Sequence, residues 1–115
     1  MRVTSDLWVS ALLRRVFAEG GFGAIVRRGA TEAGAVFVVT RNRLGETSLF
    51  GPAPQTAYDS GRPDERRFAE VANSSDYEAI EARIAKELRF DPDIWVVEIE
   101  PGTTPLAELL ALTKL

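Results

Sequence analysis

Residues 34–40 read Gly-Ala-Val-Phe-Val-Val-Thr, a nearly continuous run of β-branched and aromatic residues. Such a run is typical of a strand that is covered on both faces, because a strand with one wet face alternates apolar and polar residues. The turn sequence Asn-Arg-Leu-Gly follows at residues 42–45, and residues 46–50 then alternate, which predicts a β-hairpin. We therefore expect residues 34–40 to lie in the centre of a sheet.

Two segments on either side of this hairpin repeat apolar residues at helical spacing. Residues 6–19 carry such a stripe, with Ser5 or Asp6 as a cap and two glycines at the end. Residues 76–89 carry a second stripe, and Ser75 with Glu78 has the spacing of a capping box. The pattern predicts two main helices over these ranges.

The remaining apolar segments complete the predicted sheet. Residues 22–28 and 94–100 are short and apolar, and residues 66–72 predict a further strand although their apolar spacing also suits a helical turn. Residues 51–64 contain three prolines and two glycines, which predicts one long loop. We expect an α+β fold, with a small, mostly antiparallel sheet of four to five strands covered by the two main helices and a short C-terminal helix.

Length and composition agree with one folded domain spanning residues 1–115, with a core at 3–100 and a leucine-rich helical tail at 101–115. The chain has no histidine and no cysteine. Catalysis that uses a histidine base, a thiolate nucleophile or a zinc–thiolate site is therefore excluded. The absence of a long apolar run or signal-like N-terminus predicts a cytoplasmic protein without a membrane span.

Several segments resemble a known family. They are Leu-Trp-Val-Ser-Ala-Leu-Leu-Arg-Arg at residues 7–15, Glu-Ala-Gly-Ala-Val-Phe-Val at 32–38, Leu-Phe-Gly-Pro-Ala-Pro-Gln at 49–55, and Phe-Asp-Pro-Asp-Ile-Trp-Val-Val-Glu-Ile-Glu at 90–100. In this order and spacing the chain resembles the alphaproteobacterial Domain of Unknown Function 1491 family. The resemblance implies a bacterial protein and implies no activity, cofactor or catalytic residue.

Asp91 and Asp93 are the candidate metal ligands, since carboxylates bind Mg²⁺ and Mn²⁺ and Glu98 and Glu100 follow on the next strand. A metal-dependent hydrolase or phosphoryl-handling enzyme is the alternative that they support. The competing interpretation is a turn, because Asp-Pro-Asp after a helix bonds local backbone amides and stops the helix. We favour the turn, assign no catalytic residue and no cofactor, and lean towards a protein that is not an enzyme.

The proline-rich loop supplies the candidate ligand-binding residues. A small anionic ligand is a further alternative, bound by cations and loop residues at its mouth: Arg62, Arg66, Arg67, Pro52, Pro54 and Gln55. Neighbouring acidic residues favour mutual surface pairing of these arginines instead. A nucleic-acid partner is disfavoured, because the sequence pI is about 5.0.

The tail provides the leading hypothesis. Leu106, Leu109 and Leu110 form a short apolar stripe that the predicted core leaves without a surface to pack on. We therefore expect a small non-enzymatic binding domain that forms a homodimer or contacts a protein partner through these leucines.

Overall fold

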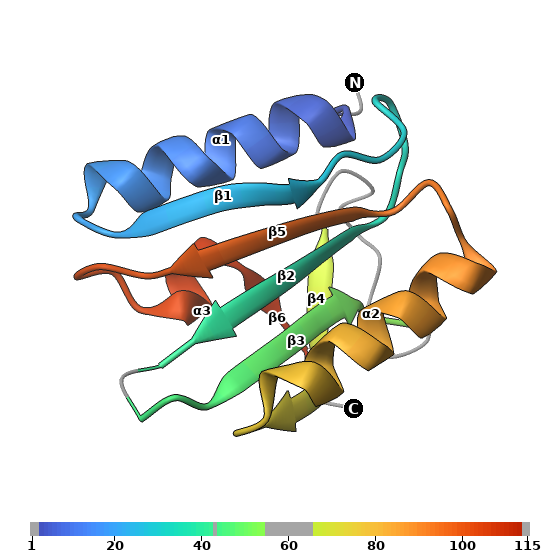
Figure 1. The fold of residues 1–115 in the computed structure, drawn as a ribbon. Coiled ribbons are helices and arrows are strands. Elements are labelled where there is room, and N and C mark those ends of the chain that lie inside the picture. Colours follow the sequence, from blue (N-terminus) through green and yellow to red (C-terminus); the bar gives the residue numbers. More distant parts are fainter. Residues whose placement is uncertain (1–2, 43, 55–65, 114–115) are drawn as a thin grey trace.

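The computed structural model describes residues 3–42, 44–54 and 66–113, which form three helices and one six-stranded sheet (Figure 1). The strands lie in the order β1-β5-β2-β3-β4-β6. In chain order the elements are α1 (Ser5–Ala18), β1 (Phe22–Arg27), β2 (Val36–Arg41), β3 (Thr47–Pro52), β4 (Arg67–Ser74), α2 (Tyr77–Phe90), β5 (Trp95–Glu100), α3 (Leu106–Leu109) and β6 (Ala111–Leu112).

Strand β2 lies inside the sheet, as its continuous apolar run predicted. It pairs antiparallel with β3 and parallel with β5, and the residues Val36 to Val39 are all buried. The expected β-hairpin is confirmed, with Asn42 Oδ1 accepting hydrogen bonds from the amides of Leu44 and Glu46.

Helices cover both faces of the sheet. On one side α1 and α3 pack on a cluster that includes Val38, Trp95 and Ile99, and on the other side α2 packs on Phe37, Val39 and Val96. Successive residues of β2 and β5 thus alternate between two apolar cores. This arrangement explains why the buried residues of β2 show no polar face in the sequence.

The α+β class and the helical covering agree with the prediction, whereas the sheet differs in size and in strand direction. Strand β6, from the tail, is an additional strand, and the β2/β5 and β4/β6 pairs are parallel. The parallel β2/β5 pair arises because β5, which follows α2, enters between β1 and β2. Local sequence does not encode this insertion, since it depends on which faces the helices cover.

The predicted loop at residues 51–64 begins later than expected. Gly51 and Pro52 belong to β3 and pair with Ala69 and Phe68 of β4, so the predicted start of the loop at residue 51 is wrong. Proline is tolerated at this position because β2 pairs with β3 only as far as Phe50. A backbone N–H at residue 52 would therefore have no hydrogen-bond partner on the β2 side of the strand. Residues 55–65 lie outside the described residues.

Both main helices begin and end at defined caps. Helix α1 is capped by Thr4, whose Oγ1 accepts a hydrogen bond from the Leu7 amide, so the predicted cap at Ser5 or Asp6 is wrong. Its last residue is Ala18, and beyond it Gly20 has a left-handed φ of +80°, while the amides of Gly20 and Gly21 donate to the carbonyls of Phe17 and Val16. Helix α2 is capped by Asp76, whose side chain accepts from the Glu78 amide, so the predicted Ser75 cap is wrong by one residue.

Candidate functional site

The segment from Asp91 to Asp93 forms a turn. Asp91 Oδ1 accepts a hydrogen bond from the Asp93 amide at 3.0 Å, and the Asp93 carbonyl accepts from the Ala30 amide at 2.9 Å. In the part of the chain that the structure describes, no group of three or more acidic side chains is placed to hold a metal ion. These contacts favour the turn interpretation over the metal hypothesis.

The predicted anion-binding arginines contact other parts of the fold where they are described. Arg66 donates to Ser5 Oγ at 2.9 Å and lies 5.9 Å from the Trp8 ring centroid, while Arg67 donates to Thr113 Oγ1 at 2.7 Å. Arg66 therefore contacts α1, and Arg67 contacts the end of the chain. Pro52 and Pro54 are exposed, and Arg62 and Gln55 lie outside the described residues.

The leucine stripe of the tail is not free. Leu109 and Leu110 are 6% and 1% exposed, and together with half-buried Leu106 they pack on the core beneath α1. The expectation that these leucines offer a partner surface is corrected, because β6 pairs with β4 and α3 lies against α1, which places the leucines in the core. The sequence pattern identified their apolar character and not the surface that covers them.

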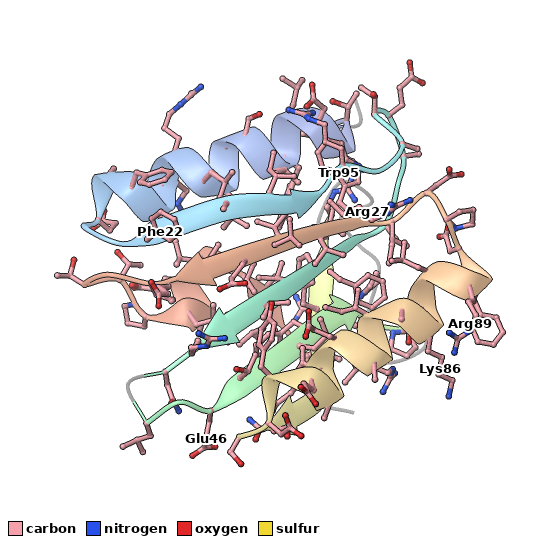
Figure 2. The ribbon with its side chains drawn as sticks, in the orientation of Figure 1. Phe22, Arg27, Glu46, Lys86, Arg89 and Trp95 are labelled. Atoms are coloured by element: carbon pink, nitrogen blue, oxygen red, sulfur yellow. The ribbon has the colours of Figure 1, made fainter. Side chains whose placement is uncertain are left out.

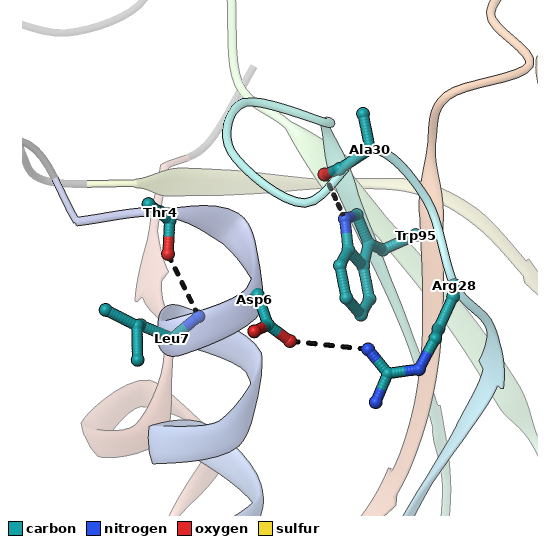
Figure 3. A network of polar contacts seen from close by, with 6 residues as sticks. All are labelled: Thr4, Asp6, Leu7, Arg28, Ala30 and Trp95. Carbon is teal, nitrogen blue, oxygen red and sulfur yellow. Dashed lines mark hydrogen bonds and ion pairs between the residues drawn. The ribbon is translucent and has the colours of Figure 1, made fainter.

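A network at the start of α1 joins the helix to the sheet (Figure 3). Arg28 forms an ion pair with Asp6 at 3.3 Å and lies over the Trp95 ring, whose Nε1 donates to the Ala30 carbonyl at 2.8 Å. Trp95 is 1% exposed, so these contacts anchor a core residue and offer no open site.

A polar cluster that the sequence analysis missed lies between α2 and the sheet. Tyr77 Oη donates to Glu98 Oε2 at 3.3 Å, and the guanidinium of Arg41 lies 4.9 Å from the Tyr77 ring centroid. Burial, followed by the neighbouring Glu98 carboxylate, raises the pKa of Tyr77 above its ordinary value of 10.0. The only sequence signal is Glu98, a charged residue within the apolar run of β5.

The second feature missed by the sequence analysis is the exposed edge of the sheet at β1. Within the described residues, β5 is the only strand that pairs with β1, and no loop or helix backbone bonds to its outer side. Phe22 and Val26 of this strand are 55% and 57% exposed. Phe17, at the end of α1, is 53% exposed and meets Phe22 edge-on, with 6.1 Å between the ring centroids.

The covering of the sheet explains why this edge is exposed. Helix α1 packs on one face of β1, while α2 packs on β3 and β4, away from β1 (Figure 1). Figure 2 places Phe22 and Arg27 at opposite ends of β1. An apolar edge strand without a covering element is a template for pairing with another strand.

The described residues contain no helix that is long and apolar enough to cross a membrane. No curated protein is significantly similar to the chain.

Solved structures resemble the chain over nearly its whole length. A solution structure of a protein from A. tumefaciens is 48% identical, with a TM-score of 0.81, and the match covers 97% of this chain and 95% of that one. A crystal structure of a DUF1491 family protein from Caulobacter crescentus is 37% identical, with a TM-score of 0.70 and 87% of each chain covered. An NMR structure of a DUF1491 family protein from Caulobacter crescentus is 36% identical, with a TM-score of 0.71, covering 90% of this chain and 89% of that one.

The family model described as "Protein of unknown function (DUF1491)" matches residues 3–106, which include α1, α2 and the strands β1 to β5 and end at the first residue of α3. The chain therefore belongs to the DUF1491 family of proteins of unknown function.

Proposed function

We propose that this protein is a binding module that forms a homodimer by pairing the edge strands β1 of two copies. The observation that carries the proposal is the outer edge of β1, which no other described strand pairs with and where Phe22 and Val26 are more than half exposed. Native proteins usually protect such an edge with charged residues, proline or a covering segment. Strand β1 has neither proline nor lysine, and its one charged residue is the terminal Arg27.

The distribution of residues along β1 suits an antiparallel partner that is a second copy. A two-fold axis beside the strand brings the Phe22 end of one copy to the Arg27 end of the other. Phe22 and Phe17 then meet the Val26 side chain of the second copy, and the exposed carboxylate of Glu19 comes near its Arg27 guanidinium. One antiparallel orientation of the two copies therefore brings apolar side chains together and also brings opposite charges together.

The edge also carries an irregularity that limits how far the pairing extends. The register of β1 against β5 shifts between Ile25 and Arg27, as at a β-bulge. A bulge bends a strand and interrupts its ladder, so we expect the backbone pairing between copies to be centred on Ala24 and to stop at Val26.

We propose this interface at β1 in place of the one expected at the tail, because Leu109 and Leu110 are buried within this chain. The metal-dependent enzyme is not carried forward, since Asp91 and Asp93 bond within their own turn and to Ala30. The cytoplasmic location stays a prediction.

Sedimentation of the full chain tests the homodimer. We expect a concentration-dependent dimer for the unmodified protein and a monomer for Val26→Lys, because a lysine places an uncompensated charge on the paired edge. Phe90→Lys is the matched control: Phe90 is also a large exposed apolar residue, at 81%, but it lies at the end of α2.

Thermal unfolding by circular dichroism establishes that each variant is folded. A monomeric unmodified protein at all concentrations, or dimers of equal stability for folded Val26→Lys and Phe90→Lys, would contradict the proposal.

A further inference from the structure

We infer that a pocket at the carboxyl ends of β2 and β5 binds a small zwitterion of the α-amino acid class. The pocket has a volume of about 490 Å³ and opens to solvent. Its volume lies within the roughly 300–1,000 Å³ that is common for small-molecule sites. Six residues line it: Thr40, Arg41, Asn42, Glu100, Pro101 and Leu106.

The parallel pairing of β2 and β5 places the two charges of the pocket together. Thr40 is opposite Ile99 in the register, so the next residues, Arg41 and Glu100, end the two strands side by side. Crevices beyond the carboxyl ends of neighbouring parallel strands are recurrent ligand sites in sheets that contain them. The order of the strands in the sheet therefore creates this site, which no contiguous sequence motif marks.

The side chains of Arg41 and Glu100 are exposed. Among the described residues, neither side chain forms an ion pair or a hydrogen bond with another side chain. The Arg41 guanidinium is held by its position over the Tyr77 ring, and Tyr77 is itself held by its hydrogen bond to Glu98. Arg41 is thus oriented by a neighbouring aromatic ring, which leaves its N–H donors available.

The combination of one cation and one anion selects the ligand class. A guanidinium binds a carboxylate through two parallel hydrogen bonds, and a carboxylate such as Glu100 pairs with an ammonium group. A simple anion is repelled by Glu100, and a simple cation is repelled by Arg41. Pro101 and Leu106 add an apolar part to the lining, which suits an apolar side chain on the ligand.

Nuclear magnetic resonance titration of the full chain with free leucine tests this inference. We expect shifts of the amide signals of Thr40, Asn42 and Leu106 that saturate. N-acetyl-leucine lacks the ammonium group and leucinamide lacks the carboxylate, so each should bind at least about tenfold more weakly.

Two variants test whether leucine binds in this pocket. Arg41→Gln should weaken leucine binding at least about tenfold, because the guanidinium that binds the carboxylate of leucine is lost. Arg14→Gln should leave binding unchanged, because Arg14 is an exposed arginine on α1, away from the pocket. Circular dichroism of both variants reports whether the fold is kept.

The inference is overturned if leucine causes no saturable shifts at these amides, or if all three compounds bind equally. It is also overturned if folded Arg41→Gln binds leucine as the unmodified chain does. The pocket does not use the exposed residues of β1, so the Val26→Lys variant should bind leucine normally whether or not the homodimer forms.

Discussion

At the scale of single residues, Tyr77 combines two roles that the sequence showed separately. It lies in the apolar stripe of α2, and its ring packs against the cluster that contains Phe37 and Ile80. Its hydroxyl reaches Glu98, the charged residue within β5. This hydrogen bond gives the half-buried Glu98 carboxylate a polar partner, and it positions the Tyr77 ring beneath the Arg41 guanidinium.

The raised pKa of Tyr77 leads to a prediction on pH dependence. The unfolded chain releases this proton near the ordinary value of 10.0, whereas the folded chain releases it at higher pH. The contribution of Tyr77 to stability is therefore complete below pH 10 and is lost as the pH rises through the folded-state pKa.

Absorbance of the tyrosinate ion during a pH titration measures this pKa, in a Tyr58→Phe background that leaves Tyr77 as the remaining tyrosine. We expect Glu98→Gln to lower the pKa of Tyr77, since it removes the neighbouring negative charge, while burial keeps the pKa above the ordinary value. An ordinary pKa in the folded parent, or no change in Glu98→Gln, would refute the prediction.

At the scale of elements, the caps of α2 show what a short sequence pattern leaves undecided. Ser75 and Glu78 have the spacing of a capping box, but Asp76 accepts the Glu78 amide. Ser74 Oγ in turn accepts the Asp76 amide at 2.9 Å, so the chain leaves β4 through a second side-chain turn. Three neighbouring residues can all cap a helix, and the exit direction of β4 selects among them.

Two alanine variants distinguish these caps. Asp76→Ala should lower the free energy of unfolding by about 0.5–2 kcal/mol, because it removes the side chain that bonds the first turn of α2. Ser75→Ala should change it much less, since Ser75 is exposed and makes no such bond in the structure. Urea unfolding compares them, and an equal or larger loss in Ser75→Ala would contradict the assignment of the cap.

At the scale of the whole molecule, the C-terminal tail is part of the core. Leu110 is 1% exposed among side chains of α1, β2 and β5, and β6 closes the sheet beside β4. Arg67 also holds the tail, through Thr113 Oγ1 and the Leu112 carbonyl. The sheet consequently ends in a two-residue strand on this side and in the open β1 on the other.

Truncating tail leucines tests this placement. Leu110→Ala should lower the free energy of unfolding by about 2–5 kcal/mol, as for other buried leucines. Leu112→Ala, in the next strand and 36% exposed, should cost clearly less. The measurement is urea unfolding followed by circular dichroism. Similar small losses in both variants would show that the tail is not packed as described.

Local patterns were sufficient to predict most elements of this protein. The apolar run of β2, the turn at residues 42–45 and the stripes of α1 and α2 each depend on interactions between residues near one another in sequence. The absence of histidine and cysteine likewise excluded whole classes of catalysis from composition. The Asp91–Asp93 turn belongs to the same category, because its defining hydrogen bond spans two residues.

The tertiary structure decided which residues share a surface. Leu106, Leu109 and Leu110 have the pattern of a partner surface in the sequence and are packed on the core in the fold, whereas Phe22 and Val26 have the pattern of a core strand and are exposed. Arg41 and Glu100 are neighbours only because β5 enters beside β2. Sequence determines what a segment forms, while burial depends on long-range packing between faces, and for this protein that packing positions both the open edge and the pocket.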